Sequence, residues 1–294
     1  MSMKDHALLV SLTVSKPQMT AKDGKATRDA EDANNASGAG HYRKDLYPKV
    51  LVAPIVAIEA SARAYIASQT YMWNRGEYLL PTTRFMTFAD RIAKFEVEFS
   101  QSVTAFLNNW SNVMQIAERN QGDLFDASAY PDLAELKSDF RFRVNYRPVT
   151  DSGDFRVDLQ EEELAALRES VEESTKESVN SILRQPLERL QKVVAKLNEA
   201  TKKEDRFVVN KKTGVSDLKS PIFRDSVVEN LMEEINLLHD FAAVLPDEVL
   251  VLAKEVVDAA PHPDQLRTNP EKRKELMGAA QSLQFASINS MLEM

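Results

Sequence analysis

Basic and apolar side chains alternate between positions 140 and 149 of the sequence. Successive side chains of a strand point to opposite faces, so Arg141, Arg143 and Arg147 would share one face, opposite the aromatic residues. Arginines near aromatic rings suit a single-stranded nucleic acid, through phosphate contacts and base stacking. The alternative is structural: the rings belong to the core, and the arginines pair with nearby acids such as Asp139. Alternation in a half-buried strand already explains the pattern, so the structural interpretation is favoured.

A second basic set lies in the connector at 202–219, and Arg156 lies on the strand expected to pair with 140–149. If the two sets share one face, they form a basic strip within an acidic chain. The residues that would contact single-stranded DNA in that arrangement are Arg141, Arg143, Arg147, Arg156, Lys202, Lys203, Lys211 and Lys212.

Aromatic residues also gather in the loop expected at 71–81. Aromatic side chains and arginine are enriched at the centres of protein–protein interfaces. A packed loop accounts for the same residues equally well. The candidate interface consists of Tyr71, Trp73, Arg75 and Tyr78.

The sequence shows no pattern typical of catalysis or of metal or cofactor binding. None of the four histidines has a partner three or four positions away, and the chain has no cysteine. The glutamate clusters at 161–163, 172–173 and 233–234 fall at a helix start or on polar helix faces, where solvated carboxylates are the ordinary case. A glycine-rich phosphate loop and a nucleophilic serine elbow are also absent. We therefore expect no catalytic residue, no metal ligand and no cofactor.

The chain of 294 residues is acidic, with 37 lysines and arginines, 45 aspartates and glutamates, and a formal net charge of −8. This balance disfavours binding of nucleic acid through the overall field of the protein, although it allows a local basic strip. Residues 1–14 lack the apolar core of a signal peptide, and the apolar patch at 50–58 is far shorter than a membrane span. We expect a cytoplasmic protein that does not contact a membrane.

The spacing of apolar residues predicts the elements that would position these sites. A β-branched run at 8–14 predicts a strand, and the polar stretch rich in Ala, Asn and Gly at 15–40 predicts a flexible arm. Strict alternation predicts a β-hairpin at 140–159. Apolar residues three or four apart predict helices at 47–70, 82–120, 161–197, 220–244, 247–258 and 269–291.

These elements predict a mainly α fold, in which the two long helices at 82–120 and 161–197 pack as an antiparallel, coiled-coil-like pair. The β-hairpin is inserted between them, and the N-terminal strand pairs with it, because an isolated hairpin is only marginally stable. The predicted domains are 1–46 (strand and flexible arm), 47–203 (long-helix core with the hairpin at 140–159) and 204–294 (helical C-terminal region).

Several segments resemble an uncharacterised protein family of bacteriophages and mobile elements. They lie at 8–13, at 40–42 (GHY), at 73–88 (WNRGEYLLPTTRFMTF) and at 130–159. The last third of the chain lies outside the resemblance. Genes of that family often lie near genes for a cobalt-chelatase-like AAA+ ATPase and for replication or recombination proteins. The family has no assigned activity, so the resemblance implies no site residues.

Together these features predict a non-enzymatic phage accessory or assembly protein that acts through oligomerisation and protein–protein interaction. Long helices and an arm favour a homo-oligomer, and an AAA+ ATPase or a host factor is the expected kind of protein partner. The alternative is an oligomeric single-stranded DNA-binding protein of phage replication or recombination that uses the basic hairpin. An enzyme is the least favoured class. The location that either function implies is the cytoplasm of a bacterial host.

Overall fold

The chain divides into two compact units, each assembled from segments that are distant in the sequence. Unit 1 comprises Met1–Leu9, Thr70–Arg84 and Pro148–Met294, and unit 2 comprises Val10–Gln69 and Phe85–Arg147. The computed structural model describes residues 5–149, 161–201, 206–209, 216–219 and 225–243, with single positions at 251, 271, 275 and 278.

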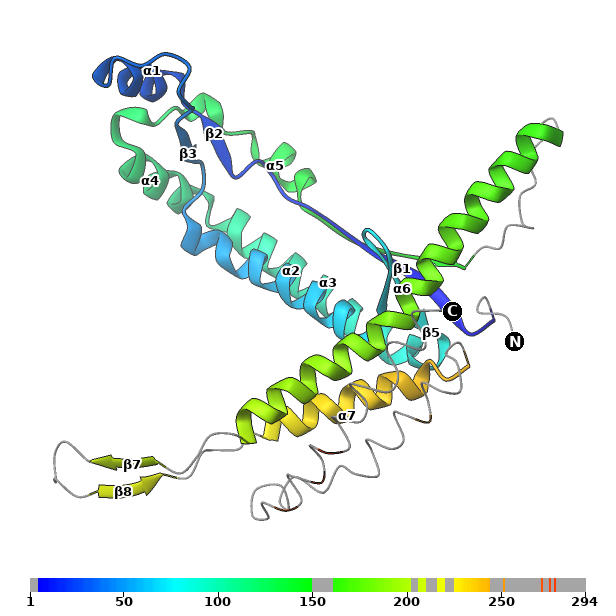
Figure 1. The fold of residues 1–294 in the computed structure, drawn as a ribbon. Coiled ribbons are helices and arrows are strands. Elements are labelled where there is room, and N and C mark those ends of the chain that lie inside the picture. The colour runs from blue at the N-terminus through cyan, green and yellow to red at the C-terminus, as the bar shows by residue number, and fades with distance from the viewer. Residues whose placement is uncertain are drawn as a thin grey trace. The chain divides into compact units, whose positions relative to one another are not determined.

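The helices and strands of the two units are labelled in Figure 1. Strand β1 (Ala7–Ser15) begins in unit 1 and continues into unit 2. The other elements of unit 2 are β2 (Thr20–Lys22), α1 (Gly24–Ala33), β3 (Arg43–Asp45), α2 (Lys49–Gln69), α3 (Phe85–Asn108), α4 (Trp110–Gln121), the 3₁₀ turns η3 (Gly122–Leu124) and η4 (Ala127–Ala129), α5 (Leu133–Asp139) and β6 (Arg141–Pro148). Those of unit 1 are β4 (Tyr71–Asn74), β5 (Glu77–Pro81), the 3₁₀ turn η2 (Thr82–Arg84), α6 (Glu161–Thr201), β7 (Arg206–Val209), β8 (Ser216–Lys219) and α7 (Asp225–Asp240).

The largest sheet has four strands in the order β4-β5-β1-β6. Two-stranded sheets join β2 to β3 and β7 to β8, both antiparallel. The fold is therefore mixed α/β, and the prediction of a mainly α fold built on long coiled-coil-like helices is wrong.

Residues 71–81, predicted as an aromatic loop, form the antiparallel β4–β5 hairpin. The side chains alternate as a strand requires, with Tyr71 and Trp73 buried and Met72 exposed between them. Gly76 forms the turn with a φ of 87°, a backbone conformation that favours glycine. The strands are too short for alternation alone to reveal them.

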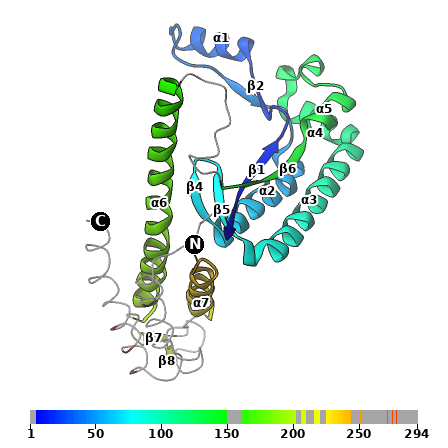
Figure 2. The same cartoon turned by 90° about the vertical axis from the view of Figure 1, so that its right-hand side faces the viewer.

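The helix predicted at 82–120 is interrupted at Asn109, whose backbone (φ −94°, ψ 18°) separates α3 from α4. The apolar stripe continues across the break, because Phe106 and Val113 are both buried. Helix α3 packs against α2, and the two run side by side in Figures 1 and 2. Helix α6 packs against α7 and β4.

Aromatic rings dominate the core of unit 2. The Tyr47 and Phe106 rings meet edge-on with centroids 5.8 Å apart, and Phe106 meets Phe140 at 5.9 Å. Burial raises the pKa of Tyr47 to about 12. Full burial of such side chains contributes about 1.5–3 kcal/mol each. The buried members of this cluster are Leu46, Tyr47, Val52, Ile55, Phe99, Val103, Phe106, Val113, Leu136 and Phe140.

Strand β6 forms where arginines alternate with apolar residues, and its neighbour in the sheet is the N-terminal strand β1, the pairing that the sequence predicts. The second strand of the predicted hairpin, at 155–159, lies outside the described residues.

Residues 15–40, predicted as a flexible arm, contain β2 and α1. The Asp23 side chain caps α1 by accepting a hydrogen bond from the backbone N–H of Ala26 at 2.9 Å. No residue of α1 is buried. The helix therefore leaves no apolar stripe in the sequence, which is the signal that revealed the longer helices.

Candidate functional site

The arginines of β6 lie at the surface of unit 2, as the alternation predicts. Arg141, Arg143 and Arg147 are all exposed. The Nε of Arg141 donates to the backbone carbonyl of Ser138 at 3.0 Å. Neither Arg141 nor Arg143 forms an ion pair with any residue that the structure describes, so the predicted pairing of these two arginines with nearby acids is not observed there.

The aromatic residues of the same segment belong to the core. Phe140 and Phe142 pack against Phe99, with ring centroids 6.5 and 5.5 Å away. Tyr146 packs edge-on against Phe85 at 5.3 Å and keeps 38% of its surface exposed. Because Phe140 and Phe142 face the core and Tyr146 is only partly exposed, these rings form no row on which successive bases could stack, and phosphate contact by the arginines is what remains of the predicted nucleic-acid site.

The other residues predicted to contact nucleic acid are not placed by the structure. Arg156, Lys202, Lys203, Lys211 and Lys212 lie outside the described residues. A continuous basic strip therefore stays a prediction.

The aromatic group predicted as an interface lies largely in the interior of unit 1. Tyr71 is fully buried and Trp73 is 9% exposed, whereas Arg75 is exposed and Tyr78 is half-buried. Buried rings cannot form an exposed contact surface. The alternative, a packed segment, agrees with this burial, although the segment is a hairpin and not a loop.

Tyr71 is the centre of a buried polar network in unit 1. Its ring lies 4.6 Å from that of Phe241, and the Arg189 guanidinium lies over it, 4.8 Å from the ring centroid. The Tyr71 hydroxyl lies 3.4 Å from Oε1 of Glu234. Burial raises the pKa of Tyr71, and the charge of Glu234 adds to the effect.

Arg189 and Glu234 join α6 to α7 and to the start of β4. The closest nitrogen of Arg189 lies 3.9 Å from Oε2 of Glu234, and Nη2 donates to the carbonyl oxygen of Thr70 at 2.7 Å. Burial raises the pKa of Glu234, and the positive charge of Arg189 opposes that effect. Every polar group here has a structural partner, so we assign the network to packing.

A second polar cluster surrounds a pocket of about 320 Å³ that is lined by residues 21–25, Lys44 and residues of η3 and η4. Asp23 and Lys44 are its buried charged residues, with Oδ2 and Nζ 3.3 Å apart. The Lys44 ammonium also donates to the carbonyl oxygen of Leu124. A hydrogen bond from the backbone of Ala26 is the main cause that holds the pKa of Asp23 below its usual value.

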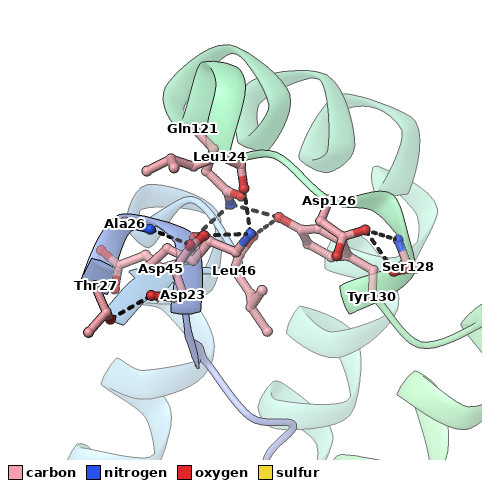
Figure 3. A network of polar contacts seen from close by, with 11 residues as sticks. Asp23, Ala26, Thr27, Asp45, Leu46, Gln121, Leu124, Asp126, Ser128 and Tyr130 are labelled. Atoms are coloured by element: carbon pink, nitrogen blue, oxygen red, sulfur yellow. Dashed lines mark hydrogen bonds and ion pairs between the residues drawn. The ribbon is translucent and has the colours of Figure 1, made fainter. Parts of the chain in front are cut away.

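The polar contacts around this pocket come from α1, β3, the end of α4 and the following turns (Figure 3). Nε2 of Gln121 donates to the carbonyl oxygen of Asp45 and to the Tyr130 hydroxyl, both at 2.8 Å. The Tyr130 hydroxyl in turn donates to the carbonyl oxygen of Leu46 at 2.8 Å.

The contacts of this pocket fix the segment before α2 to the end of α4. The described part of the chain contains no group of three His, Cys, Asp or Glu side chains able to hold a metal ion. Lys44 already neutralises Asp23, and no nucleophile is paired with a base. This cluster is therefore also structural.

One face of α2 presents apolar side chains to solvent, and this face is not among the surfaces that the sequence predicts. The opposite face is buried, with Val52, Ile55, Ala62 and Ile66 at its centre. Val50 and Val56 are 73% and 43% exposed. The exposed small apolar residues that continue this face are Ala53, Ala57, Ala60, Ala64 and Ala67.

The signal for this face was present in the sequence as a second series of apolar residues, offset from the first and spaced three or four apart. The patch considered at 50–58 belongs to a longer apolar helix. By length and composition alone, α2 could cross a membrane, which is weak evidence because a core helix of a soluble protein passes the same test. Among the described residues it is the one helix of this kind.

Comparison with protein-family models, with curated proteins and with solved structures found no match. The function is therefore inferred from the surfaces of the two units.

Proposed function

We propose that this protein is a non-enzymatic assembly protein of the cytoplasm that self-associates through the exposed face of α2. The observation that carries the proposal is that α2 is apolar on both sides while only one side is buried. A helix that is hydrophobic all round is normally buried all round. Contiguous exposed apolar surface is a feature of interaction sites.

The spacing on the exposed face favours a second copy of the same helix as the occupant. From Val50 to Ala67 the gaps between the exposed residues are 3, 4, 3, 4 and 3, so they stay on one side of the helix. This series is the same in both directions. An antiparallel second copy would place Val50 opposite Ala67 and Ala57 opposite Ala60, which is the self-complementary contact of a two-fold dimer.

The chemistry of the face also suits a close contact between two helices. Alanine side chains allow helix backbones to approach closely. Arg63, whose side chain is 51% exposed, would fall opposite Pro54 in the antiparallel arrangement. Lys49 would fall opposite Ser68, so the pairing brings no like charges together.

A membrane surface fits this face less well. Helices that lie in a bilayer interface present bulky Trp, Phe or Leu side chains, with lysine and arginine on the opposite, polar face. Here the exposed face is mostly alanine, and the opposite face packs against α3. A second copy of α2 is therefore the proposed occupant, and the experiment must distinguish self-association from lipid binding.

The direct test is size-exclusion chromatography with light scattering on the full chain. A dimer of the 33.1 kDa chain is expected. The double variant Ala57→Glu/Ala60→Glu places charges at the centre of the contact and should run as a monomer. Ala105→Glu, at an exposed alanine of α3, is the matched control and should remain a dimer.

Cross-linking tests the antiparallel register, since the chain has no cysteine of its own. A short bifunctional maleimide should join Val50→Cys to Ala67→Cys when the two variants are mixed, and should not join two copies of Val50→Cys. A wild-type monomer at all accessible concentrations would refute self-association. Co-flotation of the wild type with phospholipid vesicles, lost in the Ala57→Glu/Ala60→Glu variant, would assign the face to lipid instead.

A further inference from the structure

The sheet formed by β1 and β6 in unit 2 has one apolar and one polar face. Val14 of β1 and Phe142 of β6 pack against the same hydrophobic cluster, so these two side chains lie on the covered face. Side chains alternate along a strand. Ala7 and Leu9, at the start of β1, are buried. Beyond them, the opposite face carries Ser11, Thr13, Ser15, Arg141, Arg143, Asn145 and Arg147.

This polar face is accessible, and the two strands that form it contribute no acidic side chain to it. Thr13, Asn145 and the three arginines are exposed, and Ser11 and Ser15 are half-buried. Neither strand contains an aspartate or a glutamate. A cluster of guanidinium, hydroxyl and amide groups without a carboxylate is unusual in a chain whose net charge is −8.

The side chains on this face are the donors that proteins use to contact phosphate. Arginine, serine, threonine and asparagine are among the side chains that donate hydrogen bonds to the phosphates and sugars of nucleic acids. We propose that this face, the β1–β6 polar face, binds the phosphate backbone of a single nucleic-acid strand. The inference does not depend on self-association through α2.

The geometry favours one strand over a duplex. The arginines form a row along β6, and positions 141 and 147 are about 20 Å apart in an extended strand. A row of this length can follow one backbone, whereas a duplex presents two. Phe140 and Phe142 pack on Phe99 in the core. Phosphate contacts carry no sequence information, so binding should be independent of base sequence.

The competing explanation is that the arginines protect an edge strand. β6 is the last strand in the described order of the sheet, and charged side chains on edge strands prevent pairing with other chains. Edge protection requires no hydroxyl groups on the neighbouring strand and predicts no affinity for phosphate. The two explanations therefore differ in a measurable quantity.

The test is fluorescence anisotropy of a labelled thirty-nucleotide oligothymidylate titrated with the full chain. With three phosphate contacts, affinity should fall about 20-fold between 50 and 200 mM salt, since each contact contributes about −0.7 to the logarithmic slope for a single strand. Arg141→Ala/Arg143→Ala should reduce this fall to about threefold and weaken binding most at low salt.

The matched control removes the same charge elsewhere in unit 2. Arg28 of α1 and Arg119 of α4 are exposed. Arg28→Ala/Arg119→Ala should bind oligothymidylate as the wild type does. Absence of binding at 50 mM salt, or an equal loss in both double variants, would overturn the proposal. Tighter binding of a duplex of the same length would overturn the choice of a single strand. A single-stranded oligonucleotide of the same length and mixed sequence should bind with the same affinity as oligothymidylate.

Discussion

Each unit of the protein contains an ion pair away from the open surface, buried in unit 2 and partly buried in unit 1, and the two pairs differ in what surrounds the carboxylate. In unit 2, Asp23 lies 3.3 Å from the Lys44 ammonium and also accepts a backbone hydrogen bond at a helix start. In unit 1, Glu234 lies 3.9 Å from Arg189 and 3.4 Å from the Tyr71 hydroxyl.

The pKa values of the two carboxyls shift in opposite directions. That of Asp23 is lowered, chiefly by the backbone N–H of Ala26, whereas that of Glu234 is raised by burial. Both groups have a cationic neighbour, so a cation alone does not set the direction. The nearby backbone donor and the depth of burial decide it.

The chain offers separate probes of the two units, which allows this comparison to be tested. It has two tryptophans, Trp73 in unit 1 and Trp110 in unit 2. In a Trp110→Phe background, fluorescence follows the unfolding of unit 1. In a Trp73→Phe background, it follows unit 2. Urea titrations followed by the fluorescence of the remaining tryptophan give the free energy of unfolding of the corresponding unit.

The largest effect is expected for Arg189→Leu, read by Trp73. It removes the cation from the partly buried Glu234 and the donor from the Thr70 carbonyl. Breaking a fully buried pair lowers the free energy of unfolding by about 3–5 kcal/mol, and the partial exposure of this pair places the expected loss at the lower end of that range. Adding Glu234→Gln should restore part of the loss, because the uncompensated charge is then gone. Equal stability of the single and the double variant would contradict this account of the pair.

A smaller effect is expected for Lys44→Met, read by Trp110. Methionine keeps much of the length of the side chain, but the Leu124 carbonyl loses its donor. This loss should lower the free energy of unfolding of unit 2 by about 1–3 kcal/mol. Asp23 keeps its backbone hydrogen bond and so remains partly compensated. A loss as large as that of Arg189→Leu would show that the backbone donor does not compensate Asp23.

Tyr71→Phe should have a modest effect on unit 1. It removes only the long hydrogen bond to Glu234 and should lower the free energy of unfolding by about 0.5–1.5 kcal/mol. The same hydrogen bond lowers the pKa of Glu234, so that pKa should rise further in the variant. Titration of the Glu234 carboxyl by NMR measures the change, and an unchanged pKa would exclude the contact.

The smallest effect is expected in the pH dependence, because burial and hydrogen bonds partly cancel at each carboxyl. The raised pKa of Glu234 stabilises unit 1 fully below the unfolded value near 4.5, and this contribution is lost as the pH rises through the folded pKa. The lowered pKa of Asp23 stabilises unit 2 above 3.8, and this contribution is lost as the pH falls through the folded pKa.

Acidification from pH 7 should therefore act on the two units in opposite directions. The stability of the wild type relative to Glu234→Gln should increase as the pH falls, and its stability relative to Asp23→Asn should decrease below about pH 4. Asparagine is itself a good helix cap, so Asp23→Asn isolates the charge. The same sign for both comparisons would show that the two environments do not differ as described.

The parts of the fold that the sequence predicts well are those with long apolar periodicity. The helix expected at 47–70 is α2 at Lys49–Gln69, and the strand expected at 8–14 is β1 at Ala7–Ser15. Short or wholly exposed elements were missed. β4 has four residues, and α1 buries none, so neither produces a periodic signal.

The surfaces were harder to predict than the elements. Alternation correctly placed Arg141, Arg143 and Arg147 at the surface, but it could not show that the serines and the threonine of β1 share their face. That relation depends on pairing between strands more than a hundred residues apart. For α2, two apolar series were visible, and only the packing of α3 shows which of them is left uncovered.

The division of the chain has a consequence for its synthesis on the ribosome. All of unit 2 has been translated once residue 147 is made, whereas the Thr70–Arg84 segment of unit 1 cannot pack against α6 and α7 until these helices have been translated. At about 5–20 residues per second, α7 is complete only about 5–20 s later. For that interval the nascent β4–β5 hairpin lacks Arg189 and Phe241, whose side chains later cover the Tyr71 ring, so this ring is exposed to chaperones.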